Sequence, residues 1–171
     1  MGNTRKMVMI GFFIAIEIIL TRFLSIQTPI IRFGFGFIPL SFSAMLFGPV
    51  AGAITGAVAD IIGMMLFPKG AYFPGFTVSA ALSGAIYGMY FYKRPKNLVN
   101  IFLAVVTITL FVDLGLNTIW LSILTKKAVY AIMTPRLIKN LVTIPIKIML
   151  IHIMWKTVGI HLDKSYGKIS V

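Results

Sequence analysis

Six apolar runs, separated by short breaks that contain polar residues, glycine or proline, limit the fold of this chain more than any other feature. The predicted helices cover residues 7–24, 37–47, 50–67, 74–92, 98–124 and 137–156. A helix needs about 20 apolar residues to cross a hydrocarbon core of roughly 30 Å. The longer runs meet this requirement, whereas the second is short. Residues 1–171 therefore predict one all-α transmembrane domain, a bundle of six helices.

The composition excludes an ordinary soluble domain. Hydrophobic residues make up 58% of the chain and charged residues only 12%, against roughly 45–50% and about 25% in soluble domains. The absence of cysteine excludes disulfides and thiolate chemistry. In a membrane protein the net charge of +12 indicates lipid-facing anchors or a site for an anionic solute, rather than a nucleic-acid partner.

An even number of spans places both termini on one side of the membrane, and a weak excess of basic residues favours the cytoplasm. The eight predicted cytoplasmic cations are Arg5, Lys6, Lys93, Arg94, Lys96, Lys156, Lys164 and Lys168, and the six predicted outer cations are Arg22, Arg32, Lys69, Lys126, Lys127 and Arg136. Cations on the outer side oppose the usual distribution, so we expect a function to retain them there.

Charged side chains also lie inside the apolar runs, where each costs free energy unless it is paired or faces water. These residues are Glu17, Asp60, Asp113 and Lys147. Asn117 and Trp120 follow Asp113 at one-turn spacing, and Lys139 lies near the outer end of the last run. With the termini in the cytoplasm, this polarity gathers in the outer half of the bundle.

The segment Arg32-Phe33-Gly34-Phe35-Gly36-Phe37 alternates aromatic residues with glycines. Two interpretations are equally supported. The segment forms a hairpin lid whose rings stack on a flat ligand, or the rings belong to an aromatic belt at the membrane surface. Tyr72 and Phe73 in a later loop present the same choice.

Small residues recur at four-residue spacing, which places them on one helix face. Such stripes allow close contact between membrane helices, and internal packing is the favoured interpretation. The stripes are Gly48, Gly52 and Gly56 followed by Asp60, then Ala80, Gly84 and Gly88, and the pair Gly11 and Ala15 on the first helix, which is a candidate partner-facing surface.

The motifs predict neither an enzyme nor a cofactor. His152 and His161 are too few and too far apart to predict a metal site, and no phosphate-binding loop is present for ATP hydrolysis. Two function classes remain: a membrane subunit that binds a flat anionic solute from outside, and a small channel or structural membrane protein. A channel needs a polar stripe through the whole bilayer, and the inner half lacks one apart from Glu17, which favours the binding subunit.

Several motifs resemble the substrate-binding S components of energy-coupling factor (ECF) vitamin transporters. The broadly shared feature is the segment Gly-Pro-Val-Ala-Gly-Ala-Ile-Thr-Gly-Ala-Val-Ala-Asp (48–60). The folate-specific branch is resembled more closely by Asp113-Leu-Gly-Leu-Asn117-Thr-Ile-Trp120, Thr134-Pro-Arg136-Leu-Ile-Lys139 with Pro145-Ile-Lys147 beyond it, and Arg22-Phe23 followed by the loop at Arg32. The resemblance covers nearly the whole chain.

This resemblance implies a subunit of a bacterial cell membrane that captures folate outside the cell at high affinity. It would dock on a transmembrane coupling subunit driven by two ATPases, and rotate to release the vitamin inside. Docking in the family uses an Ala-xxx-Ala pair, and here Gly11 replaces the first alanine while Ala15 matches the second. Related subunits for pantothenate, niacin or thiamine are the alternative.

Folate combines a flat pterin with two glutamate carboxylates, and the candidate contacts follow from that chemistry. The carboxylates call for Arg or Lys, for which the available residues are Arg22, Arg32, Lys69, Arg136 and Lys139. The candidates for stacking on the pterin are Phe33, Phe35, Tyr72 and Trp120. Asn117 is the first candidate for the amino-pyrimidine edge and Asp60 the second, although Asp60 is also a candidate partner of Lys147.

Overall fold

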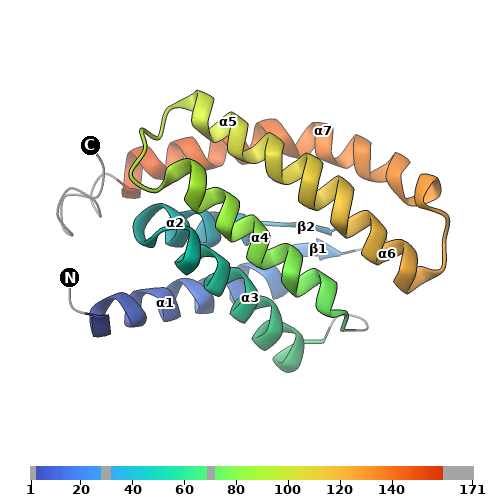
Figure 1. Cartoon of the computed structure of the whole chain (residues 1–171), viewed down its shortest axis with the longest axis horizontal. Coiled ribbons are helices and arrows are strands. Elements are labelled where there is room, and N and C mark those ends of the chain that lie inside the picture. The colour runs from blue at the N-terminus through green and yellow to red at the C-terminus, as the bar shows by residue number, and fades with distance from the viewer. Residues whose placement is uncertain (1–2, 28–31, 69–71, 160–171) are drawn as a thin grey trace.

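The apolar runs form helices in the computed structural model, which describes residues 3–27, 32–68 and 72–159 (Figure 1). The elements are α1 (Asn3–Arg22), β1 (Ser25–Gln27), β2 (Arg32–Gly34), α2 (Phe37–Phe47), α3 (Pro49–Leu66), α4 (Pro74–Phe91), α5 (Leu98–Thr107), the π-helix η1 (Ile108–Leu116), α6 (Asn117–Thr125), α7 (Val129–Met154) and the π-helix η2 (Trp155–Gly159). α5, η1 and α6 follow one another without a break and make one long segment, as do α7 and η2.

The prediction of an all-helical bundle with six segments is confirmed. Two boundaries differ from those expected by four residues or more, and the others agree within about two residues. α1 begins at Asn3 rather than at residue 7, and α7 begins at Val129, eight residues before the predicted start at 137. The early part of α7 contains Tyr130, Thr134 and Pro135. Hydropathy marks the apolar part of a helix, and this helix continues beyond it.

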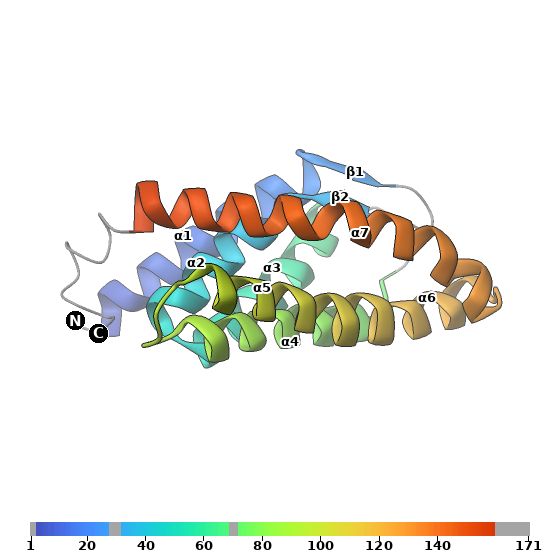
Figure 2. The same cartoon turned by 90° about the horizontal axis from the view of Figure 1, so that it is seen from above.

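The helices form an elongated bundle (Figures 1 and 2). α7 returns antiparallel to the segment α5–η1–α6, and the β1–β2 hairpin lies on the same side of the bundle as α7. The start of α1 and the end of η2 lie at one end, and the turn between α6 and α7 lies at the other. This arrangement agrees with an even number of passes through a membrane.

The glycine stripes of α3 and α4 pack the two helices backbone to backbone. A Cβ atom added at Gly52 would collide with the carbonyl of Gly84, and one added at Gly56 would collide with the carbonyl of Ala80. The favoured interpretation of these stripes as internal packing is therefore confirmed. This close contact holds α3 and α4 together, and it therefore fixes Asp60 of α3 relative to the start of α4.

The chain turns sharply between α2 and α3 at Gly48. Its φ angle of +93° belongs to the region that residues with a Cβ atom rarely adopt. Pro49 then occupies the first turn of α3, where the missing N–H costs no hydrogen bond. The break at Gly48-Pro49 therefore separates two helices, as predicted.

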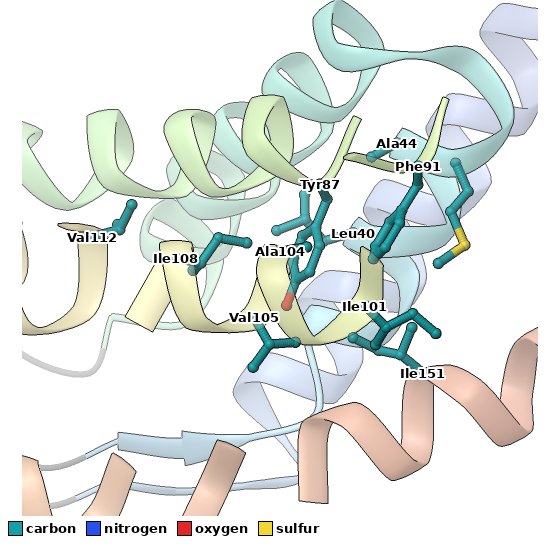
Figure 3. Close-up of a cluster of buried hydrophobic side chains, with 11 residues drawn as sticks. Leu40, Ala44, Tyr87, Phe91, Ile101, Ala104, Val105, Ile108, Val112 and Ile151 are labelled. Carbon is teal, nitrogen blue, oxygen red and sulfur yellow. The ribbon is translucent and has the colours of Figure 1, made fainter. Parts of the chain in front are cut away.

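The main apolar core lies between α2, α4, α5 and α7 (Figure 3). Its largest fully buried side chains include Tyr87 and Phe91 of α4, whose rings stack at 5.6 Å between centroids. Ile101 and Val105 of α5 and Ile151 of α7 close the cluster. These residues fill the half of the bundle near the ends of the described chain, where Ser43 of α2 and Thr55 of α3 are also buried.

Three helical segments are long and apolar enough to cross a membrane, judged by length and composition of the described residues. They are Pro49–Leu66, Leu98–Thr125 and Val129–Thr157. α2 has only 11 residues, and the glycines, serines and tyrosines of α4 lower its mean hydropathy. Large apolar side chains such as Met65 and Leu141 are more than 70% exposed, as expected where lipid is the solvent.

Candidate functional site

Arg22, the last residue of α1, lies against α3 and is only 4% exposed. Its Nη1 atom donates to the sulfur of Met64 at 3.2 Å, and Nη2 lies 3.5 Å from the main-chain oxygen of Asp60 and 4.0 Å from Oδ1. A Cβ atom at Gly63 would come within 2.7 Å of Nε of Arg22. The glycine therefore makes room for the guanidinium between α1 and α3.

Asp60 links this contact to α4. Its Oδ2 atom accepts a hydrogen bond of 2.8 Å from Oγ1 of Thr77, which lies 3.2 Å from the hydroxyl of Tyr72. We call Arg22, Asp60, Tyr72 and Thr77 the Arg22 cluster. Thr77 was not among the predicted residues, because a single threonine in an apolar helix gives no signal by itself.

Asp113 of η1, rather than Asp60, is the partner of Lys147. The Nζ atom of Lys147 donates to Oδ2 of Asp113 at 3.2 Å, and Nδ2 of Asn117 lies 3.4 Å from Oδ1. The alternative that Asp60 pairs with Lys147 is therefore wrong. Helix spacing could not decide between the two aspartates, because it leaves the rotation of one helix relative to another undefined.

Arg136 of α7 bonds the main chain of the neighbouring segment. Its Nη2 atom donates to the carbonyl of Asp113 at 2.8 Å and its Nη1 atom to the carbonyl of Asn117 at 3.1 Å. A π-helix has wider turns than an α-helix and occurs frequently at functional sites, and here it ends where Arg136 binds. We call Asp113, Asn117, Arg136 and Lys147 the Asp113 cluster.

Trp120 joins α6 to the start of α4. Its indole N–H donates to Oγ of Ser79 at 3.2 Å, and its ring lies 5.6 Å from that of Phe73 between centroids. A Cβ atom at Gly75 would approach the indole within 2.6 Å. The predicted stacking residue Trp120 is thus fixed in orientation by a hydrogen bond, a ring contact and a glycine.

Asn140 of α7 is a polar residue that the sequence analysis missed. It is 3% exposed, and neither Oδ1 nor Nδ2 has a hydrogen-bond partner among the described residues. The Oδ1 atom of Asn117 is likewise buried without a partner in the described part of the chain. Asn140 follows Arg136 by one helical turn, and this spacing was the signal that would have found it.

The hairpin predicted as one interpretation of the glycine–aromatic segment is present. β1 and β2 pair antiparallel, with Ser25 opposite Gly34 and Gln27 opposite Arg32. Of the other predicted contacts, Arg32 and Phe33 are described only in their backbone, and Lys69 lies outside the described residues. Phe35, which follows β2, and Lys139 of α7 are half-buried.

Gly11 and Ala15 lie on an exposed face of α1. Both residues are exposed, and a Cβ atom added at Gly11 would meet nothing within 4 Å. Phe12 and Ile19 on the same helix are 57% and 52% exposed. This face therefore packs against none of the described helices, in contrast to the glycine stripes of α3 and α4.

Comparison with known proteins gives one family and two relatives. The model of the family described as ECF transporter, substrate-specific component, matches residues 5–155. The chain is 51% identical over 158 residues to a protein of Clostridium novyi named folate transporter FolT, with 92% of each chain covered. It is 33% identical over 152 residues to the folate transporter FolT of Leuconostoc mesenteroides, with 85% of this chain and 82% of that protein covered.

A solved structure shares the fold. The crystal structure of a FolT protein bound with folic acid superimposes with a TM-score of 0.84 and is 38% identical in sequence. The similarity covers 88% of this chain and 92% of that chain. The bundle described above is therefore close to that of a protein seen with its ligand.

Proposed function

Because the chain belongs to the family of ECF transporter substrate-specific components, we propose that it is the folate-binding subunit of such a transporter. The observation that carries this proposal is the similarity to a solved protein bound with folic acid, at 38% identity over 88% of the chain. The curated relative at 51% identity, named a folate transporter, supports the same ligand. Folate is captured at the end of the bundle that holds the two polar clusters.

In this proposal the Asp113 cluster supplies the floor of the site. Lys147 and Arg136 already bond η1 and the start of α6, so their role is to hold Asn117 in place. Asn117 binds the pterin, and Asp60, which bonds Thr77 and lies beside Arg22, is the second candidate. Trp120, fixed beside α4, stacks on the flat ring.

In this proposal, cations nearer the hairpin bind the glutamate carboxylates of folate. Arg22 ends α1 directly before the hairpin that carries Arg32, and Lys139 lies on the half-buried side of α7. Together with Lys69, which precedes α4 in the sequence and lies outside the described residues, these residues form the proposed anion-binding group. Phe33 of β2, Phe35 directly after it and Tyr72 are the proposed aromatic contacts with the ligand.

The exposed face of α1 is the proposed docking surface for the coupling subunit. Gly11 and Ala15 allow another helix to approach closely, as small residues do in membranes. The chain itself supplies no ATPase activity, and two ATPase subunits drive the cycle through the coupling subunit. The subunit lies in the bacterial cell membrane with both termini in the cytoplasm, which places the polar clusters at the outer side.

The test is uptake of radiolabelled folate into proteoliposomes that contain this chain with a coupling subunit and two ATPases. We expect accumulation that requires ATP and all four components, and binding without accumulation by the chain alone. Thiamine and pantothenate serve as control substrates. Accumulation by the chain alone, or no folate uptake by a complex shown to be assembled, would contradict the proposal.

A further inference from the structure

The buried amide of Asn140 is unusual within the described part of the chain. The residue is 3% exposed, yet its oxygen and its nitrogen both lack a partner there. Buried polar groups in proteins are nearly always hydrogen-bonded, and each exception calls for an explanation.

The position of Asn140 follows from its neighbours on α7. Arg136, Asn140 and Lys147 lie within about 40° of one another around the helix axis, so they share one face. Arg136 donates to the carbonyl of Asp113 and Lys147 to its carboxylate. Asn140 lies between these two anchors along the helix, and therefore faces η1 and the start of α6.

The charged residues next to Asn140 on this face bond other groups and not its amide. Arg136 donates to two main-chain carbonyls, and Lys147 is paired with Asp113. Asn117 turns its Nδ2 atom toward Asp113, because a carboxylate only accepts, and its Oδ1 atom is buried without a partner in the described residues. The face thus presents two amide oxygens that need donors and one amide nitrogen that needs an acceptor.

These unpartnered amide atoms can form hydrogen bonds with one end of the proposed ligand but not with the other. A carboxylate accepts hydrogen bonds but donates none, so it would face the two oxygens unfavourably. The pyrimidinone edge of a pterin carries an amino group and a ring N–H beside a carbonyl, in one plane. It can therefore donate to both amide oxygens and accept from the amide nitrogen.

We propose that Asn140 is a specificity-determining residue that, together with Asn117, binds the pyrimidinone edge of the pterin. This inference rests on the proposed function, and it adds the orientation of the ligand. The pterin lies against α7 and the start of α6, and the glutamate points toward the hairpin. Asn140 touches the ring directly, whereas Arg136 and Lys147 position the segment that carries Asn117.

The experiment compares folate with pteroate, which lacks the glutamate, by competition against labelled folate in detergent. Asn140→Leu and Asn140→Ala are the test variants, the second of which adds no bulk. Thr143→Val is the matched control. Thr143 is buried on the same side of α7, but its hydroxyl already donates to the carbonyl of Lys139 at 2.7 Å. The unfolding temperature of each protein is measured without ligand.

We expect both Asn140 variants to raise the Kd for folate and for pteroate by the same factor, on the order of ten- to a hundredfold. Their unfolding temperature without ligand should be unchanged or higher, because two unpartnered buried polar atoms have been removed. Thr143→Val should bind both ligands as the parent does.

Three results would overturn the inference while leaving the proposed function standing. If both Asn140 variants bind folate and pteroate with the Kd of the parent protein, Asn140 does not contact the ligand. Weaker folate binding with unchanged pteroate binding would assign Asn140 to the glutamate instead. A large drop in the unfolding temperature of both variants without ligand would make the role structural. Failure of the parent protein to bind folate would instead refute the proposed function itself.

Discussion

The Nζ atom of Lys147 lies 3.2 Å from Oδ2 of Asp113, so an ion pair joins two helical segments across 34 residues of sequence. The two side chains are only 13% and 18% exposed. Each charge alone would be costly at that depth, and each lowers the cost of the other. The pair fixes the rotation of α7 against η1, and with it the face that carries Arg136 and Asn140.

Breaking this pair on one side should destabilise the protein more than removing both charges. We expect Asp113→Asn to lower the free energy of unfolding by about 3 kcal/mol, because it leaves Lys147 buried without its counter-ion. The double variant with Lys147→Met should recover most of that loss. Unfolding of the detergent-solubilised proteins measures both values, and a double variant no more stable than Asp113→Asn would contradict the expectation.

Glycines of the same type should differ in their tolerance of bulk according to their contacts. Gly52→Val should cost at least about 2 kcal/mol, because its side chain would push α3 away from the backbone of α4. Gly11→Val is the control, since a Cβ there meets nothing within 4 Å. Thermal unfolding distinguishes the two variants. Equal stability would show that the close approach of α3 and α4 is not required.

Bulk on the exposed face of α1 should separate binding from transport. We expect Gly11→Leu and Ala15→Leu to bind folate as the parent does and to abolish uptake in the complete transporter, because added bulk keeps the coupling subunit at a distance. Ala131→Leu is the matched control on an exposed position of α7. Normal uptake by both α1 variants would remove the docking surface from the account.

Two predicted contacts can be tested directly by substitution. Asn117→Ala and Arg22→Ala should each raise the Kd for folate at least about tenfold, the effect of losing a hydrogen bond to a buried polar or charged group. Asn100→Ala is the control, because the Asn100 amide bonds the carbonyl of Pro95 on the surface. If folate binds Asn117→Ala and Arg22→Ala as tightly as the parent, the site lies elsewhere.

The helices were predictable because burial in lipid requires long apolar runs. Such runs can be recognised from the order of the residues alone, without knowledge of the contacts between helices. The ends of the helices were less predictable. α7, for example, begins at Val129, before the start of its apolar run. The turn at Gly48-Pro49 was also predictable, since glycine and proline mark such positions. The hairpin with Arg32 was one of two equally supported interpretations, and the structure shows that it forms.

The pairing of side chains between helices was not predictable from the sequence. Asp60 and Asp113 are equivalent candidates for Lys147 until the rotations of α3, η1 and α7 are known, and the structure pairs Lys147 with Asp113. The π-helix adds to the difficulty, because it shifts Asn117 relative to a regular helix. Asn140 was not predicted, because it carries neither the charge nor the aromatic ring that marked the other candidate residues.

The most direct test of the account is a titration of the purified protein with folate, followed by tryptophan fluorescence. The chain has two tryptophans. Trp120 lies beside the proposed site, whereas the ring of Trp155 lies 4.9 Å from Nζ of Lys96 near the opposite end of the bundle. A Trp155→Phe variant therefore reports on the site through Trp120 alone.

We predict saturable quenching of this variant at nanomolar folate and no response to thiamine or pantothenate. A response to another vitamin but not to folate would keep the transporter family and contradict the ligand. The absence of any response to folate, in protein shown to be folded and in an independent binding assay, would contradict the central claim.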